Sequence, residues 1–531
     1  MTSSAINPPA GHQVDDDELA QHGYNQRLSR SLGGFSSFAA GFSYISILTG
    51  MFQLFGFGYG FGGPLLFWSW LIVLGGQFCV ALVFAELTAR YPIAGSVYQW
   101  SKKMSSRQGS WFAGWTMLVG SIVTVASVSM AMQVVLPQIS DFFTFFDDTA
   151  KNAVFLGTCT IVLTTLVNLA GVKVMALVNN IGVAAELIGV GLIIVLLAFH
   201  IQRGPEVVLT TQGAGAGLPG WETLGYLAPV LMAAIMPAYV MYGFDTAGSL
   251  AEETRDPRRT TPKALLQALA AAGGAGALLL LLALMVANSL DPAVLGVGGL
   301  PAVLEQALGS TLGKILLVDV AFAIFICTMA IQTASIRMGF SMARDHALPF
   351  GESLSHVTDR RGSPVAAALV TGILAIALLI VNFGNAQVFL VVTSVAIAIV
   401  YIAYLLVTIP VMARRLRGWP EDQGRTGWFY LGRVPGLVIN ALAVGYGGLM
   451  TINLLWPREE IWGSGTYAWG GVFFVVVVSV VGLTYYRLTQ HGSERRIAHE
   501  HRFEGRTLSG NAAMPNPSIS GIVAAETVEE N

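Results

Sequence analysis

Three carboxylates lie within long apolar stretches of this sequence, where an ionised side chain is costly. Glu186 stands in VNNIGVAAELIGVGLIIVLL, Asp245 in VMYGFDTAG and Asp319 in ILLVDVAFAIF. A charge at the centre of a bilayer is so unfavourable that such a residue usually faces the protein interior and has a role. Glu186 could exchange protons, because removal from water favours the protonated carboxyl. The structural alternative is a neutral carboxyl hydrogen-bonded to a neighbouring helix.

The other two carboxylates have simpler interpretations. Asp245 directly follows helix-breaking residues, so we expect it to cap the helix that resumes there rather than to contact a substrate. Asp319 lies near the outer end of its stretch, where it could simply reach water.

Two apolar stretches are interrupted in comparable positions. Residues 41–60 read GFSYISILTGMFQLFGFGYG and are rich in glycine, and residues 231–253, LMAAIMPAYVMYGFDTAGSLAEE, contain Pro237 and Gly243. Paired interrupted helices indicate a transporter binding site, because their freed backbone groups and half-helix dipoles can meet a carboxylate and an amine. The alternative is that these glycines only allow close helix packing.

The composition indicates a membrane protein around these residues. Of 531 residues 54% are hydrophobic and 11% charged, against about 25% charged in soluble proteins. Apolar runs long enough to span a bilayer recur, and their continuity excludes barrel strands. We predict an all-α membrane protein with twelve transmembrane helices, at 38–60, 64–88, 112–136, 153–172, 178–200, 226–250, 265–288, 314–340, 364–382, 387–412, 435–456 and 467–487.

The ends of the chain are polar. We predict a cytoplasmic tail at 1–35, a transmembrane domain at 36–488 and a second cytoplasmic, disordered tail at 489–531. The N-terminal region lacks the pattern of a cleavable signal. Cys79, Cys159 and Cys327 fall within predicted spans without metal-ligand spacing, so we expect packing roles, no metal and no cofactor. We expect no nucleic-acid partner.

Positive charge predicts the orientation. If both termini are cytoplasmic, the 29 lysines and arginines lie on the cytoplasmic side, with four exceptions. The exceptions are Lys151, Arg203, Lys314 and Arg458. This distribution follows the positive-inside rule, and one missed span would reverse the side of every later loop. We therefore expect a multi-pass protein of the cell membrane.

Three segments resemble a known family. Residues 81–104, ALVFAELTARYPIAGSVYQWSKKM, resemble the end of span 2 and the next loop of amino acid–polyamine–organocation (APC) superfamily permeases. Residues 241–265, MYGFDTAGSLAEETRDPRRTTPKAL, are similar to their span 6 region, and residues 336–349, IRMGFSMARDHALP, to the end of their span 8. The resemblance covers about 23–487, and the N-terminal part is similar to the amino acid/choline transporter branch.

The resemblance implies a fold and a function. The fold would be a LeuT-like five-plus-five inverted repeat plus two helices. The function would be secondary active import of an amino acid or a small amine, such as 4-aminobutyrate or choline, by alternating access.

The resemblance also implies binding residues. The family's Gly-Ser/Thr-Gly break falls on Leu48-Thr49-Gly50, where the first glycine is absent. Thr49, Gly50 and Met51 would supply groups for a substrate carboxylate, and Ser46 a backbone carbonyl for the amine. The aromatic gate falls on Tyr239, with Tyr242 before the second break. These rings could hold an ammonium by cation–π attraction or could simply pack.

Energy coupling has three alternatives. Proton-coupled relatives carry a lysine in span 5 at the position where Glu186 falls here. We expect Glu186 to be the ion-coupling residue and the ion to be a proton, while sodium coupling and ion-free exchange stay open.

The loop after span 6 carries dense mixed charge, including Glu252, Glu253 and Arg255. These residues could form an inner gate, or the loop could only set the orientation.

An integral-membrane enzyme is the alternative from another class. It would need clustered His, Asp or Cys at one membrane face. His200, His346 and His356 are scattered, and HEHRFEG lacks the HExxH spacing. We therefore expect no enzyme activity.

The topology predicts a labelling pattern. In a variant without native cysteines, Cys introduced at Ser140 or Gly463 should react with an impermeant thiol reagent on intact cells. Cys at Ser105 should react only after permeabilisation. Labelling of Ser105 alone on intact cells would reverse the orientation.

Overall fold

The computed structural model describes residues 28, 30–212, 214, 215, 218, 221–358, 363–381, 386–420 and 428–490. These residues are helical, and their β structure consists of two isolated bridges, Leu32 with Thr254 and Thr358 with Ser363. The predicted tails, 1–35 and 489–531, lie mostly outside the described residues, and their prediction stays open.

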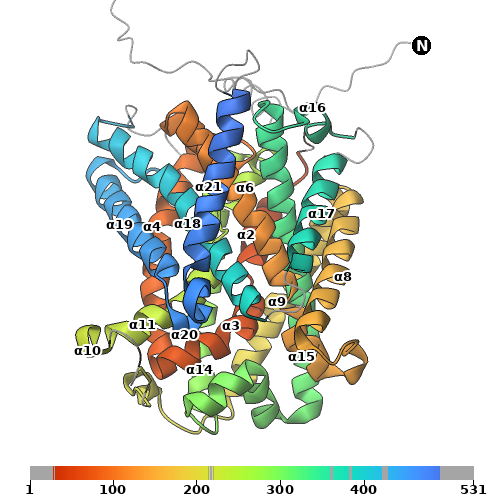
Figure 1. The fold of residues 1–531 in the computed structure, drawn as a ribbon, viewed down its shortest axis with the longest axis vertical. Helices are drawn as coiled ribbons and strands as arrows, with labels where there is room; N and C mark the ends of the chain where they lie inside the picture. The colour runs from red at the N-terminus through yellow and green to blue at the C-terminus, as the bar shows by residue number, and fades with distance from the viewer. Residues whose placement is uncertain are drawn as a thin grey trace, which may run out of the picture. The chain divides into compact units, whose positions relative to one another are not determined.

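The longer helices run mainly along the vertical axis of Figure 1. In chain order they are α2 (Gly34–Ile45), α3 (Ile47–Gly62), α4 (Leu66–Arg90), α5 (Ser96–Met104), α6 (Arg107–Ser129), α7 (Met132–Ile139), α8 (Thr149–Leu169), α9 (Val172–Ala198), α11 (Leu227–Ala233), α12 (Ile235–Val240), α14 (Pro257–Val286), α15 (Pro292–Arg344), α17 (Val365–Val381), α18 (Ala386–Leu416), α19 (Arg433–Leu455) and α21 (Gly470–Tyr485). The short α13 (Thr246–Ser249) follows α12.

Each of the twelve predicted ranges overlaps one or more helices, and the sixth, 226–250, contains α11, α12 and α13. Within the described part of the chain, nine helical stretches are long and apolar enough to cross a membrane, and one of them, Gly34–Arg90, contains α2, α3 and α4. The protein is therefore an all-helical, multi-pass membrane protein.

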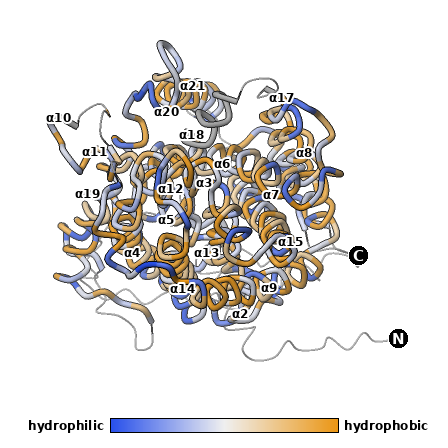
Figure 2. Tube along the Cα trace, turned by 90° about the horizontal axis from the view of Figure 1, so that it is seen from below, coloured by the Kyte–Doolittle hydropathy of each residue, from blue (hydrophilic) through white to orange (hydrophobic). Residues whose placement is uncertain are grey.

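Large apolar side chains are exposed on the peripheral helices. Ile188 of α9, Leu449 of α19 and Phe473 of α21 are each about 70% exposed, at 71%, 70% and 69%. Figure 2 shows hydrophobic residues on the outside of the bundle as well as inside it. Such a surface is stable where it meets lipid chains rather than water.

Helix α15 is longer than its predicted span. It continues from Pro292 to Arg344 through two non-helical glycines, Gly299 (φ 60°) and Gly309 (φ 78°). The predicted span, 314–340, is the part after the second kink.

Candidate functional site

The first helix interruption lies at Ser46, between α2 and α3. The backbone of Ser46 is non-helical (φ 35°, ψ 100°), and the helix resumes at Ile47. A helix that begins here leaves its first N–H groups without acceptors in the same helix. Because Ser46 is completely buried, these groups need partners within the protein.

Glu186 of α9 supplies that partner. Its Oε1 accepts hydrogen bonds from the Ser46 hydroxyl (2.8 Å) and from the Leu48 N–H (3.2 Å). The hydroxyls of Ser46 and Thr49 share a further hydrogen bond (2.6 Å). A negative charge at a helix N-terminus is favoured by the helix dipole. Glu186 therefore caps α3 from a different helix.

The second carboxyl oxygen of Glu186 has a different environment. The side chain is 1% exposed, and Oε2 is buried without a hydrogen-bond partner. Leaving a buried acceptor unpaired is costly, and the cost falls when the oxygen binds a proton, a donor or a cation. This oxygen is consequently where α9 can take part in ion or proton binding.

The second interruption separates α12 from α13. Gly243 adopts φ 84°, and its N–H donates to the Tyr404 hydroxyl (2.9 Å). A Cβ atom at Gly243 would overlap the ring of Tyr44 in α2. The two interruptions are therefore in direct contact, and the glycine allows that contact.

Aromatic rings surround this contact. The ring of Tyr242 packs edge-on against those of Tyr44 (5.7 Å between centroids) and Tyr239 (6.1 Å). The hydroxyl of Tyr239 bonds with that of Ser127 (3.0 Å), and the hydroxyl of Tyr242 with that of Thr124 (3.0 Å). Helix α6 thus fixes both rings, and π faces of this kind can attract an ammonium group.

The structure brings the predicted binding residues together but moves the break. Ser46, Thr49, Gly50, Met51, Tyr239 and Tyr242 are all buried around the two interruptions. The break at Leu48-Thr49-Gly50 was predicted wrongly, because Ser46 is the non-helical residue and the next three residues already belong to α3.

The position of the break changes the role expected of Gly50. The N–H of Gly50 donates to the Ser46 carbonyl oxygen (3.1 Å), so this N–H is not available to a substrate in this conformation. A Cβ atom at Gly50 would come within 2.5 Å of Val240 Cγ2. Gly50 therefore allows α3 to approach α12 closely.

The predicted capping role of Asp245 is wrong. Asp245 occupies the N-cap position of α13, but its side chain makes no capping hydrogen bond. Its carboxylate accepts hydrogen bonds from Ser96 in α5 (2.8 Å) and from Tyr404 in α18. The carboxyl group instead joins three segments beside the second break, because one oxygen accepts from Ser96 and the other from Tyr404.

Buried ion pairs form a layer on the side of the protein that the sequence predicts to be cytoplasmic. We call them the ion-pair layer: Glu253–Arg337 (2.9 Å), Glu252–Arg344 (3.0 Å) and Lys102–Asp345 (2.8 Å). Glu253 is completely buried and bonds both Nε and a terminal nitrogen of Arg337. The layer joins the segment after α13 to the end of α15.

Sequence reasoning missed several of these partners. It counted Lys102, Arg337 and Arg344 only as cytoplasmic charges and did not consider Asp345 or Tyr404. A signal existed for the arginines, because Arg337 and Arg344 lie at the predicted cytoplasmic end of their span, on the same side as Glu252 and Glu253.

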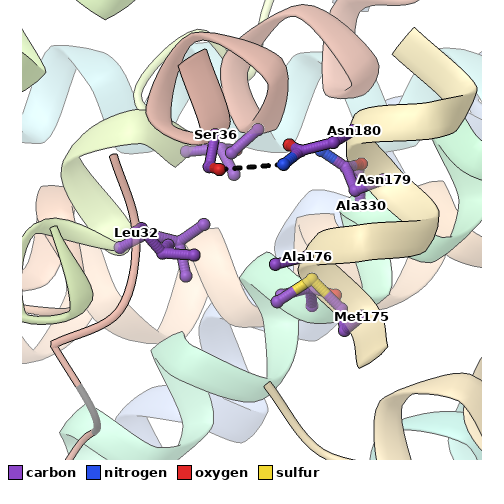
Figure 3. Close-up of a pocket in the computed structure, with 11 residues that line it drawn as sticks. Leu32, Ser36, Met175, Ala176, Asn179, Asn180 and Ala330 are labelled. Carbon is purple, nitrogen blue, oxygen red and sulfur yellow. Dashed lines mark hydrogen bonds between the residues drawn. The ribbon is translucent and has the colours of Figure 1, made fainter. Parts of the chain in front are cut away.

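A small, mainly apolar cavity lies between α2, α9, α13 and α15, with Asn179 and Asn180 among its lining residues (Figure 3). Its volume is about 10 Å³, which is enough for about one water molecule. Asn180 donates from Nδ2 to the Ser36 hydroxyl (3.0 Å), while the Oδ1 atoms of Asn179 and Asn180 are buried and unpaired.

Comparisons with known proteins agree with this geometry. A family model described as amino acid permease matches residues 32–486. The amino-acid permease BAT1 of Arabidopsis thaliana is 27% identical, covering 82% of this chain and 87% of its own length. An uncharacterized amino-acid permease of Schizosaccharomyces pombe, C1039.01, is 28% identical, covering 84% of this chain and 78% of its own length. The thiamine transporter thi9 of the same yeast is 23% identical, covering 78% of this chain and 76% of its own length.

The contact of Gly50 with Val240 predicts the effect of a larger side chain. Gly50→Leu should abolish uptake while the protein still inserts, because α3 could no longer approach α12. Gly75→Leu is the matched control, because a Cβ at Gly75 meets open space. Uptake and surface expression are measured together. Normal transport by Gly50→Leu would remove this helix contact from the site.

The ion-pair layer predicts a charge-reversal effect. Removing one partner of a buried pair costs about 3–5 kcal/mol, so Glu253→Lys should change the uptake rate strongly. The double variant with Arg337→Glu restores opposite charges and should recover part of the rate at equal surface expression. An unchanged rate and apparent affinity in Glu253→Lys would leave the loop as an orientation signal only.

Proposed function

The chain belongs to the amino acid permease family and is a transporter rather than an enzyme. We propose that it imports an amino acid or related small amine by alternating access. The family match confirms the resemblance of the three sequence segments. The cargo class rests on the family and on the site. Relatives are named for amino acids and, in one case, for thiamine, and 4-aminobutyrate and choline remain within the proposed class.

The contact between the two interruptions is the observation that carries this proposal. Tyr44 beside Gly243 brings the start of α3 next to the aromatic rings of Tyr239 and Tyr242. Glu186 occupies the start of α3 in this conformation, so a substrate carboxylate would bind this helix N-terminus in place of the Glu186 attachment, while an ammonium is favoured on a tyrosine face. A zwitterion with both groups therefore matches the two sides of the contact.

The proposal includes a complete topology. We propose twelve transmembrane helices in the cell membrane, with both termini cytoplasmic. The first five and the next five helices would form inverted repeats of the LeuT type. The interruptions support this arrangement, because they lie in the first predicted span and in the sixth, which opens the second set of five.

The ion-pair layer is proposed to be the inner gate. Its three pairs are buried and closed in this conformation. Opening toward the cytoplasm would separate Glu253 from Arg337 and hydrate both, which limits the desolvation cost of the broken pair. The same pairs would form again when the cytoplasmic side closes.

We further propose that transport is coupled to protons through Glu186. An ionised Glu186 makes charge-assisted bonds to Ser46 and to the Leu48 N–H, and such bonds are stronger than neutral ones. Protonation at Oε2 weakens this attachment between α9 and the start of α3. Loading a proton would therefore change how firmly the first interruption is fixed, which links protonation to helix movement.

Coupling through Glu186 predicts separate effects on two activities. In proteoliposomes without sodium and with an inward proton gradient, the wild type should concentrate substrate. Glu186→Gln should lose concentrative uptake but keep exchange of labelled for unlabelled substrate, because Gln preserves the side-chain shape and cannot titrate.

Empty liposomes and a set of unlabelled competitors complete that experiment. The competitors are amino acids, 4-aminobutyrate, choline and polyamines, which define the cargo. Concentrative uptake by Glu186→Gln would exclude this residue as the proton carrier. A strict requirement of the wild type for sodium would favour sodium coupling, and exchange without any gradient-driven uptake would identify an exchanger.

A further inference from the structure

Helices α9 and α15 pack antiparallel through two glycines of α9. A Cβ atom at Gly182 would overlap Ile326, and one at Gly189 would overlap the carboxyl of Asp319. The two contacts are seven residues apart in both helices, which is two helical turns. Gly189 thus leaves the space that the Asp319 carboxyl occupies against the backbone of α9.

Glu186 lies between these glycines on the same buried face of α9. It precedes Gly189, the residue against which the Asp319 carboxyl packs, by three residues, a rise of about 4.5 Å. Asp319 Oδ2, like Glu186 Oε2, is buried without a hydrogen-bond partner. Two acids with unpaired buried oxygens therefore lie within one helical turn of each other along this face of α9, and each of these oxygens can accept a proton.

Other groups near Glu186 do not provide a competing charge. In the described structure, α15 adds the thiol of Cys327, and Tyr44, Ser46 and Thr49 contribute hydroxyl groups, whereas α2 and α3 carry no charged side chain. Lys314 of α15 is exposed, five residues before Asp319, and Lys151 lies in the first turn of α8. Helix α9 has one further charged residue, Lys173, in its first turn, and the charges of α14 are confined to its first two turns. Asp319 is therefore the acidic partner of Glu186.

The contact between α9 and α15, from Gly189 and Asp319 to Gly182 and Ile326, differs at its two ends in its access to water. Asp319 is partly exposed and lies toward the side that the proposed topology assigns to the outside. On the other side of Glu186, Ile326 fills the space over Gly182, and the small cavity lined by Asn179 lies beyond it. In this conformation an apolar contact separates Glu186 from that cavity, while the Asp319 carboxyl lies on its outer side.

We propose that Asp319 is the residue that delivers protons from the outer medium to Glu186. The O–H bond at Asp319 Oδ2 breaks, an O–H bond forms at Glu186 Oε2, and Asp319 remains as a carboxylate. Asp319 then takes the next proton from outer water, so one proton enters the site for each one transferred. This step rests on the proposed proton coupling of Glu186.

The test uses the full-length chain in proteoliposomes, with Asp319→Asn and the control Glu305→Gln. Glu305 is an exposed carboxylate of the same helix. We expect Asp319→Asn to slow proton-driven uptake about tenfold. This factor is smaller than the rate gain that a positioned proton donor gives an enzyme, because conformational steps also limit the rate of transport. Its uptake should also require a more acidic outer medium. Exchange at equal pH should be retained, and Glu305→Gln should match the wild type.

The outcomes separate the two proposals. Wild-type uptake that ignores the pH gradient would refute proton coupling by Glu186, and the Asp319 step with it. Loss of proton-driven uptake in Glu186→Gln together with wild-type rate and pH profile in Asp319→Asn would refute the Asp319 step alone. If Asp319→Asn fails to insert, Gly189→Ala decides. It keeps both carboxyls but displaces that of Asp319, and unchanged proton-driven uptake in this variant would overturn the proposal.

Discussion

The rest of the site depends on one interaction, the attachment of the Glu186 carboxyl to the start of α3. An interrupted helix inside a membrane protein exposes backbone N–H groups where no water can satisfy them. Glu186 resolves this problem through the Ser46 hydroxyl and the Leu48 N–H. The same attachment holds α9 against the interruption and leaves the second carboxyl oxygen unpaired. A structural requirement and a chemically active group are thus provided by one side chain.

Charge is used differently at the ion-pair layer. There, every member of the three named pairs is buried, but each acid meets a base at hydrogen-bond distance. Glu186 and Asp319 have no basic partner among the ion pairs of the described residues. Fully paired charges stabilise one arrangement of segments, whereas acids without a base respond to protons. The proposed inner gate and the proposed proton path would therefore be built from different kinds of buried charge, paired in one and without a base in the other.

Much of the helix arrangement could be predicted from the sequence, because apolar runs of membrane length are strong signals. The interruptions were also predictable as features, from glycine and proline within such runs. Their positions were less predictable. The break at Ser46 is stabilised by Glu186, which is distant in sequence. Asp245 does not cap α13, and its two oxygens instead accept from Ser96 and Tyr404. Contacts between distant residues decided both cases, and no local pattern encodes them.

The bridge between Leu32 and Thr254 has a consequence for how the two interrupted helices move. The Leu32 N–H donates to the Glu253 carbonyl oxygen (2.8 Å), and the Arg255 N–H donates to the Leu32 carbonyl oxygen (3.0 Å). These backbone bonds connect the segment before α2 with the segment after α13. A movement of α2 would therefore be transmitted to the end of α13, and the reverse. Because backbone groups form it, this linkage does not depend on the identity of the side chain at Arg255, whereas the Leu32 side chain is also buried against Ala40 and Leu250. Proline is the exception, since it has no N–H to donate.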